Sequence, residues 1–219
     1  MQHKKKFTSN SNFLAMSYIL TAPKDADFEK EKLPLLVFLH GAGECGDDPE
    51  ILNTVVTISQ IFGEEDEYHG IRAITLSPQC PEGLVWNHLV LPLKELIDQI
   101  ADEYHVDRDR ISITGYSMGG FGVWDMICTY PELFSAAAPI CGGGLSWRVG
   151  VLNKLPIRAF HGGADTVVPP VYSETMVETV QMIGGNASLT VYPGVDHGSW
   201  KPAYQTSDVI EWLLQQRRK

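Results

Sequence analysis

Short apolar runs alternate with longer amphipathic stretches along most of this chain. Residues 35–39 form an uninterrupted apolar run, a pattern typical of a strand that helices cover on both faces. Between residues 87 and 104 apolar side chains recur instead at spacings of three and four, which predicts a helix. The same reasoning predicts further strands at 16–21, 71–76, 110–114, 134–140, 156–160 and 189–192. It predicts further helices within 49–62 and at 121–128, 171–183 and 203–216.

Strands and helices alternate regularly from residue 35 onward. This order predicts an α/β fold with a mostly parallel, doubly wound sheet and helices on both of its faces. The sequence contains no repeat and no linker that would mark a boundary, so residues 1–219 are predicted to form a single domain. In such a sheet, functional groups gather in the loops that follow the carboxyl ends of the strands.

The charge balance narrows the possible partners. A formal net charge of −10 argues against binding to nucleic acid or to an anionic membrane surface. Basic runs occur only at residues 4–6 and 217–219, and both are predicted to be solubilising tails. No apolar run is long enough for a membrane span, and no export signal is recognisable. A cytoplasmic location is therefore the default expectation, with an exported, processed form left open.

The strongest motif is Gly-Tyr-Ser-Met-Gly at residues 115–119. It stands between a predicted strand and a predicted helix, which is the context of a nucleophile elbow. The turn at Ser117 is so tight that small residues are needed two positions before and after it. This geometry predicts that Ser117 Oγ is exposed at the strand end and that the Met118 N–H points toward developing negative charge.

Two later strand ends carry the residues that would activate this serine. Asp165 follows the strand at 156–160, and His197 follows the strand at 189–192. The chain order serine, aspartate, histidine is the order of an α/β-hydrolase triad. Ser117 is the predicted nucleophile, His197 the base and then the acid, and Asp165 the group that orients the imidazole.

Other residues compete for these roles. His40 and His161 also stand at strand ends, each before a glycine, and both are predicted to orient loops. Asp196 is adjacent to His197 and too constrained to orient its ring. A second oxyanion donor is expected from residues 41–44, with Ala42 N–H as first choice and Gly43 N–H as second.

These residues resemble the α/β-hydrolase superfamily over nearly the whole chain. The similarity is to bacterial serine esterases of the phospholipase/carboxylesterase and dienelactone-hydrolase-like group, often labelled predicted peptidases or feruloyl-type esterases. It rests on the matching stretches at residues 39–44, 77–81 with Trp86, 109–120, 161–165 and 197–200. The resemblance implies a metal-free carboxylic ester hydrolase that works through an acyl-enzyme. No cofactor is expected, and the protein is expected to be a monomer or homodimer. Dienelactone hydrolases proper use a cysteine nucleophile, whereas this chain has Ser117.

The substrate site is predicted from the loops around the elbow. Only 15 residues, 141–155, occupy the position where larger hydrolases insert a lid, which predicts an open cleft for small or exposed carboxylic esters. The candidate substrate-binding residues are Trp86, Trp147, Trp200 and Glu44. Alternative functions with the same triad are a prolyl-oligopeptidase-like peptidase and an acyl thioesterase, and a catalytically inactive binding protein is a further alternative.

Four cysteines are present, at positions 45, 80, 128 and 141, and none forms a Cys-x-x-Cys pair. Zinc binding is therefore not indicated, and free thiols are the default. In the fold that the resemblance implies, Cys45 and Cys80 follow neighbouring strands. A disulfide between them is an open expectation for an exported form.

Overall fold

A computed structural model describes residues 2–54 and 67–218 of the chain. Eight strands of the described part form one sheet in the order β1-β2-β6-β3-β7-β8-β9-β10. They are β1 (Gln2–Thr8), β2 (Ala15–Thr21), β3 (Leu35–Leu39), β6 (Ile74–Pro78), β7 (Ile111–Tyr116), β8 (Ala136–Ile140), β9 (Ile157–Gly162) and β10 (Ala187–Tyr192). The last six strands in this order pair in parallel, whereas β2 is antiparallel to both β1 and β6. The predicted mostly parallel sheet is confirmed.

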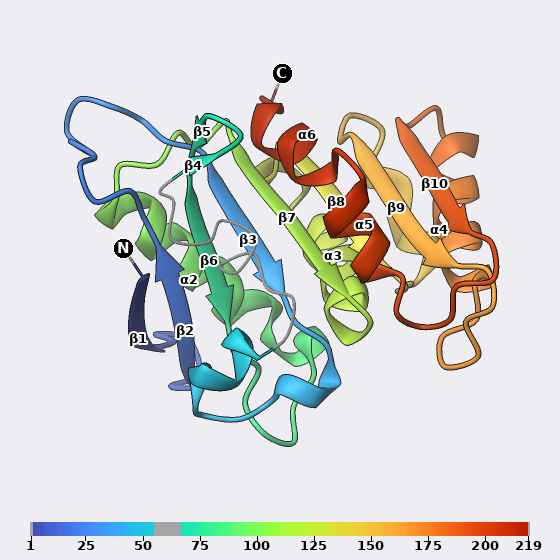
Figure 1. The fold of residues 1–219 in the computed structure, drawn as a ribbon, viewed down its shortest axis with the longest axis horizontal. Coiled ribbons are helices and arrows are strands. Elements are labelled where there is room, and N and C mark those ends of the chain that lie inside the picture. Colours follow the sequence, from blue (N-terminus) through green and yellow to red (C-terminus); the bar gives the residue numbers. More distant parts are fainter. Residues whose placement is uncertain (1, 55–66, 219) are drawn as a thin grey trace.

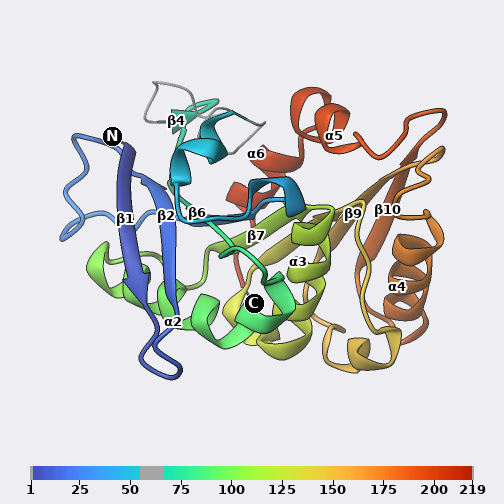
Figure 2. The ribbon, with the colours of Figure 1, turned by 90° about the horizontal axis from the view of Figure 1, so that it is seen from below.

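Helices cover both faces of this sheet (Figures 1 and 2). One face carries α2 (Val90–Glu103), α3 (Met118–Thr129) and α4 (Val171–Met182), and the other carries α5 (Trp200–Thr206) and α6 (Val209–Gln215). A small hairpin of β4 (Glu67–Tyr68) and β5 (Ile71–Arg72) lies on the same side as α5 and α6 (Figure 2). Short 3₁₀ helices complete the connections: η1 (Ala42–Glu44), η2 (Pro49–Asn53), η3 (Trp86–Leu89), η4 (Pro131–Leu133) and η5 (Ser146–Val151).

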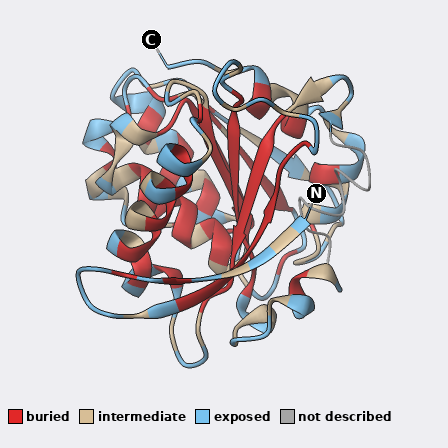
Figure 3. Ribbon diagram, turned by 90° about the vertical axis from the view of Figure 1, so that its left-hand side faces the viewer, coloured by how far each residue is buried: buried red, intermediate tan, exposed pale blue. Residues whose placement is uncertain are grey.

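The central strands separate two hydrophobic cores. Every residue of β3, β6, β7 and β8 is buried, so the middle of the sheet contacts helices on both sides (Figure 3). Side chains alternate between the faces, as along any strand: Leu35, Val37 and Leu39 enter the larger core, and Leu36 and Phe38 enter the smaller one. This double burial explains why residues 35–39 are apolar without interruption.

The two basic ends of the chain are not free tails, contrary to the prediction. Residues 2–8 form the edge strand β1, in which Lys4 pairs with Glu50 and Lys5 Nζ lies 2.6 Å from Glu103. At the other end Arg217 contacts Asp107 at 2.7 Å and Arg218 contacts Asp109 at 2.8 Å. Carboxylates distributed over the surface compensate these cations, and composition alone did not indicate that pairing.

One helix prediction needs correction as well, and another is tested only at its start. The helix expected at 203–216 is two helices, because Ser207 leaves the helical conformation between α5 and α6. Its hydroxyl donates to the Ala203 carbonyl and accepts from the Val209 N–H, a local alternative to helical hydrogen bonds. Of the helix expected within 49–62, the structure describes only the 3₁₀ turn η2 and Thr54, and residues 55–66 lie outside the described residues.

Candidate active site

The strand register brings the loops of the predicted site to one edge of the sheet. Leu39 of β3 pairs with Gly115 of β7, so the loop that starts at His40 lies beside the turn at Ser117. On the other side of β7 follow β8, β9 and β10, all parallel to it. Their carboxyl ends therefore open on the same rim, which carries the loops after β9 and β10.

Ser117 occupies a strained turn between β7 and α3. Its φ of 55° and ψ of −121° lie outside the region that non-glycine residues ordinarily adopt. A Cβ at Gly115 would approach the Leu39 carbonyl oxygen to 2.6 Å, and a Cβ at Gly119 would overlap that oxygen. Both flanking glycines are therefore required by the close approach of β3 to the turn. The strain holds the Ser117 side chain at the rim, where it is partly exposed.

Three side chains from three loops form a continuous hydrogen-bonded chain. The His197 Nδ1 lies 2.7 Å from Asp165 Oδ2, and the His197 Nε2 lies 2.8 Å from Ser117 Oγ. A carboxylate only accepts hydrogen bonds, so Nδ1–H is the donor and Nε2 retains its lone pair. This tautomer leaves the imidazole able to take the proton of the Ser117 hydroxyl.

Asp165 is held as a carboxylate in spite of its burial. Its side chain is fully buried, and burial by itself would raise the pKa. The hydrogen bond from His197 and the N–H groups of Val167 and Val168, both 2.9 Å from Oδ1, outweigh that effect. The pKa of Asp165 accordingly lies below its ordinary value, and the ionised form is favoured.

The loop that carries His197 returns from β10 across the end of β9. A Cβ at Gly162 would overlap the carbonyl oxygens of Val195 and Asp196, so glycine is needed where the loop crosses. The Val195 carbonyl accepts from the Ala164 N–H at 2.9 Å, which joins the loop of the base to the loop of the acid. Asp196 accepts from the Gly198 N–H at 2.9 Å and so shapes this loop, rather than orienting the imidazole.

The predicted oxyanion donors lie on the two segments that flank Ser117. Met118 is the first residue of α3, and its N–H is among those that a helix leaves without an internal partner. Ala42 and Gly43 belong to η1 and are both exposed, and a Cβ at Gly43 would meet nothing within 4 Å. The structure therefore brings all three residues to the rim beside Ser117.

His40 has a different environment from His197, although both follow a strand. Its side chain is fully buried, and its Nε2 accepts the Cys80 N–H at 2.9 Å. The Nδ1–H accordingly faces the Gly41 carbonyl at 2.6 Å and the Glu44 carboxylate at 3.6 Å. These contacts use both ring nitrogens, so His40 supports the loop and is not available as a base.

Glu44 was predicted to bind substrate, and the structure instead turns its carboxylate inward. Burial by itself would raise the pKa of Glu44, but His40, the Tyr116 hydroxyl and the Gly41 N–H together lower it. The side chain is 13% exposed and faces His40. Glu44 thus supports the η1 loop from inside, which corrects its assignment to the substrate site.

Trp86 is a core residue, contrary to its predicted place in the substrate site. It is fully buried, its indole N–H donates to the His40 carbonyl at 2.9 Å, and its ring meets the His40 ring edge-on at 5.0 Å. Gly122 of α3 packs so closely on it that a Cβ there would lie 2.6 Å from the Trp86 Cβ. Trp86 therefore supports the His40 loop from beneath.

Trp147 is exposed, and the residue after it binds to the middle and end of α3. It is 78% exposed in η5, and the next residue, Arg148, binds Asp125 at 2.8 Å and Thr129 at 2.7 Å. At the rise of an α-helix these two residues lie about 12 and 18 Å along α3 from Ser117. These contacts of Arg148 do not support a place for Trp147 beside Ser117, and its predicted role in the substrate site stays a prediction. Residues 141–155 contribute η5, which packs on α3 and α4.

Trp200 was predicted to bind substrate, and it lies beside His197. Its ring stacks on Tyr116 with 4.5 Å between centroids and meets the His197 ring edge-on at 5.5 Å. It is partly exposed at the start of α5. Trp200 thus restrains the imidazole on one side and offers an apolar surface beside it.

An aromatic pair that the sequence analysis missed lies on the other side of the nucleophile. The Phe121 N–H donates to the Ser117 carbonyl at 3.1 Å, one helical turn from the elbow. Its ring meets Tyr172 of α4 edge-on at 5.8 Å, and Tyr172 is 48% exposed. The position of Phe121, four residues after the nucleophile, was a usable signal, whereas the pairing with Tyr172 depends on tertiary structure.

His161 supports the loop of the acid, as predicted for a loop-orienting residue. It is fully buried, its Nε2–H donates to the Val168 carbonyl at 2.8 Å, and its Nδ1 lies 2.7 Å from Ser173 Oγ. The Nε2 also lies 3.3 Å from Asp165 Oδ2. Asp165 is therefore fixed by both histidines and by two backbone donors.

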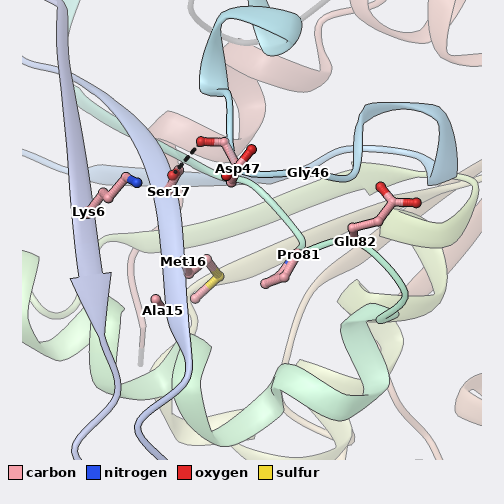
Figure 4. A pocket seen from close by; sticks show the side chains of 8 residues that line it. All are labelled: Lys6, Ala15, Met16, Ser17, Gly46, Asp47, Pro81 and Glu82. Carbon is pink, nitrogen blue, oxygen red and sulfur yellow. Dashed lines mark hydrogen bonds between the residues drawn. The ribbon is translucent and has the colours of Figure 1, made fainter.

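A pocket of about 440 Å³ lies beside β1 and β2, away from these groups (Figure 4). Its lining includes Lys6, Asp47 and Glu82, and no residue of the Ser117 hydrogen-bonded chain. Among the described residues, one group of possible metal ligands is close enough to share an ion, namely Cys141, Asp165 and His197. Two of these are already hydrogen-bonded to each other, so the group belongs to the serine site.

Comparisons with known families and structures identify the relatives of this chain. The model of the family described as the dienelactone hydrolase family matches residues 78–209. A poly(3-hydroxyalkanoate) depolymerase C from Paucimonas lemoignei is 40% identical over 151 residues, which cover 55% of this chain and 32% of that protein. The chain thus spans about a third of the length of this curated relative.

Solved structures share the fold of this chain. A thermostable esterase is 35% identical with a TM-score of 0.87, covering 99% of this chain and 63% of the other. The feruloyl esterase module from Clostridium thermocellum has a TM-score of 0.70 at 14% identity, covering 93% and 84%, and supports the fold alone. The predicted α/β-hydrolase fold is confirmed. No helix in the described part of the chain is long and apolar enough to cross a membrane.

Proposed function

This chain belongs to the dienelactone hydrolase family, and we propose that it is a serine carboxylesterase that hydrolyses small or exposed esters through an acyl-enzyme. The observation that carries the proposal is the hydrogen-bonded chain from Ser117 through His197 to Asp165, with distances of 2.8 and 2.7 Å. A serine hydroxyl becomes an effective nucleophile when a positioned base takes its proton. The thermostable esterase and the depolymerase among its relatives agree with this reaction class.

In the first half of the reaction Ser117 Oγ attacks the ester carbonyl carbon while His197 Nε2 takes the hydroxyl proton. The negative charge of the tetrahedral intermediate develops on the former carbonyl oxygen. The Met118 N–H and an N–H of Ala42 or Gly43 are the proposed donors to that oxygen. Asp165 stabilises the imidazolium that forms, and collapse of the intermediate transfers the proton to the departing alcohol.

The second half repeats these steps with water. His197 takes a proton from a water molecule that attacks the acyl carbon, and the same donors stabilise the second tetrahedral intermediate. The proton then returns to Ser117 Oγ as the carboxylic acid leaves. The contacts of Asp165 with Val167, Val168 and His197 keep its carboxylate in place through both halves.

The substrate class follows from the surfaces next to Ser117. Trp200 on one side and the Phe121–Tyr172 pair on the other offer apolar faces at the rim. Within residues 141–155, η5 packs on α3 and α4, which supports the proposed open cleft. We expect a short acyl group or an aryl group between these faces, with the rest of the ester exposed to solvent.

Replacement of Ser117 by Ala tests the function. We expect turnover of nitrophenyl butyrate to fall roughly 10⁴–10⁶-fold while the melting temperature stays within a few degrees. Ser199→Ala is a matched control, because Ser199 is buried nearby on the His197 loop and takes no part in the hydrogen-bonded chain. Substantial turnover by the Ser117→Ala variant would refute the proposal.

A panel of substrates then tests the proposed class. Nitrophenyl esters from acetate to palmitate are compared with a short acyl thioester and a prolyl peptide anilide. The proposal predicts the highest kcat/KM for short acyl esters and weak turnover of the thioester and the anilide. A preference for long acyl chains would contradict the open cleft, and a preference for the anilide or thioester would indicate a peptidase or thioesterase.

A further inference from the structure

Two cysteines lie side by side behind the proposed oxyanion loop. Cys45 directly follows η1, which carries Ala42, Gly43 and Glu44, and Cys80 follows the end of β6. Cys80 is fully buried, Cys45 is partly exposed, and both are free thiols in this structure.

Hydrogen bonds on both sides of Cys45 fix the two segments against each other. The Gly46 N–H donates to the Cys80 carbonyl at 2.9 Å, and the Gln79 side-chain amide donates to the Glu44 carbonyl at 3.0 Å. Main chains joined by an N–H to carbonyl bond lie about 5 Å apart. Cysteines joined by a disulfide have Cα atoms about 4.4–6.8 Å apart, so the main-chain bond from Gly46 to Cys80 favours a separation in this range.

The thiols are also close enough for each to influence the pKa of the other, although the Cys80 thiol donates to the Leu84 carbonyl at 3.3 Å. Burial raises the pKa of Cys45, and the neighbouring Cys80 thiol opposes part of that rise. Burial and the neighbouring Cys45 raise the pKa of Cys80 as well. Both groups are therefore protonated thiols at neutral pH, and oxidation requires the small thiolate fraction of the more accessible Cys45.

From this geometry we propose that Cys45 and Cys80 are a disulfide-forming pair that tethers the η1 loop to the end of β6. The loop is already held at its start, where His40 accepts from the Cys80 N–H and Trp86 donates to the His40 carbonyl. The disulfide would hold its other end. The claim that the disulfide would also fix the oxyanion donors rests on the proposed function. The claim that the disulfide forms does not.

The chemistry is thiol–disulfide exchange with a small aliphatic disulfide. The Cys45 thiolate attacks one sulfur of the reagent, forms a mixed disulfide and releases one thiolate. The Cys80 sulfur then attacks the Cys45 sulfur and releases the second reagent thiolate. The protein loses two hydrogens, which the reagent gains as it is reduced to two thiols.

The pocket beside β1 and β2 lies next to the two cysteines and is the proposed route for the reagent. Gly46 and Pro81, the residues that follow the two cysteines, both line it, together with Asp47 and Glu82 (Figure 4). Because two carboxylates and one lysine, Lys6, line this pocket, a neutral reagent is preferable to an anionic one such as oxidised glutathione.

The test incubates the full chain with the neutral 2-hydroxyethyl disulfide at a mildly alkaline pH. We expect two of the four thiols to disappear and a peptide linking Cys45 to Cys80 to be recovered after proteolysis. The melting temperature of the oxidised protein should exceed that of the reduced protein by about 5–10 °C, because the bond closes a long loop.

Two matched variants separate this pair from the other cysteines. Cys45→Ser should lose both the linked peptide and the shift in melting temperature, and it should fold because Cys45 is partly exposed. Cys128→Ser, which removes a thiol on α3, should keep both. Stable mixed disulfides at Cys45 and Cys80, a linkage that involves Cys128 or Cys141, or an unchanged melting temperature would overturn the proposal.

Discussion

The loops after β3 and after β10 each contain a histidine, yet the two histidines have opposite environments. His40 is fully buried, and both of its ring nitrogens are engaged, with Cys80 and with Gly41. His197 is partly exposed, and its Nε2 faces Ser117 Oγ at 2.8 Å. One ring supports a loop that offers backbone N–H groups, and the other ring is itself able to move a proton.

This contrast shows how the site divides its tasks. In the loop after β10 the side chain carries the proposed chemistry, so its identity matters most. In the loop after β3 the backbone of Ala42 and Gly43 is the proposed functional element, and buried side chains such as Trp86 and Glu44 serve to hold it. Substitutions in the loop after β10 should therefore affect turnover. Substitutions of the buried side chains behind the loop after β3 should instead affect stability.

The largest expected effect separates the two histidines directly. His197→Gln should lower kcat for nitrophenyl butyrate roughly 10⁴-fold or more with little change in the urea midpoint, because the base is lost while the fold is not. His40→Gln should lower the unfolding free energy by about 2–4 kcal/mol, because a buried hydrogen-bonded ring is removed. Kinetics and urea unfolding of both variants provide the measurement. Equal effects of the two variants on turnover and on stability would remove the distinction.

The next effect concerns Asp165, whose pKa is lowered in the folded state. Asp165→Asn should lower kcat by roughly 10⁴-fold by disturbing the imidazole tautomer. A carboxyl with a lowered folded pKa stabilises the protein above its unfolded pKa of about 3.9, and this stability is lost as the pH falls through the folded value. The stability difference between wild type and variant should therefore shrink on acidification. Urea unfolding across this range measures it, and a difference independent of pH would contradict the assignment.

A comparison of two glycines should show an effect on stability of intermediate size. Gly119→Ala should destabilise the protein by about 3 kcal/mol or more, because its Cβ would overlap the Leu39 carbonyl oxygen and push α3 from β3. Gly43→Ala should change stability by less than about 0.5 kcal/mol, because its Cβ meets nothing within 4 Å. Thermal unfolding of both variants distinguishes them. A stable Gly119→Ala variant would show that the elbow tolerates a wider turn.

The smallest effect compares two tryptophans. Trp200→Ala should raise KM for aryl esters about 3–10-fold, because the apolar surface beside His197 is lost. Trp147→Ala should leave kcat and KM unchanged, because the neighbouring Arg148 binds Asp125 and Thr129, about two to three turns along α3 from Ser117. Steady-state kinetics on both variants test the two assignments. A change in KM confined to Trp147→Ala would reverse them.

The sequence was most informative where only one physical cause explains why a residue type occurs at its position. The apolar run at 35–39 predicted a strand covered on both faces, and the glycines around Ser117 predicted the tight turn. It was least informative where an aromatic or charged residue fits two environments. Trp86 and Trp200 both stand in loops near strand ends, and only packing against Gly122 or Tyr116 distinguishes a core residue from a rim residue.

Polar pairing across the fold was also beyond prediction. Glu44 lies in a glycine-rich loop, where an exposed carboxylate was expected, but its carboxylate faces the buried His40. The lysines of β1 resembled a tail because their carboxylate partners Glu50 and Glu103 are distant in sequence. The predicted set Ser117, Asp165 and His197 lies within hydrogen-bonding distance, and its catalytic role stays a prediction until it is measured.

The most direct test of the account is to trap the nucleophile. The protein is treated with a small aryl phosphonate ester, and the adduct is located by peptide mass spectrometry alongside loss of nitrophenyl butyrate turnover. The account predicts one phosphonyl group per chain, on Ser117, with its incorporation rate strongly reduced in His197→Gln. Complete loss of turnover with the group on another residue, or retained turnover with Ser117 fully modified, would contradict it.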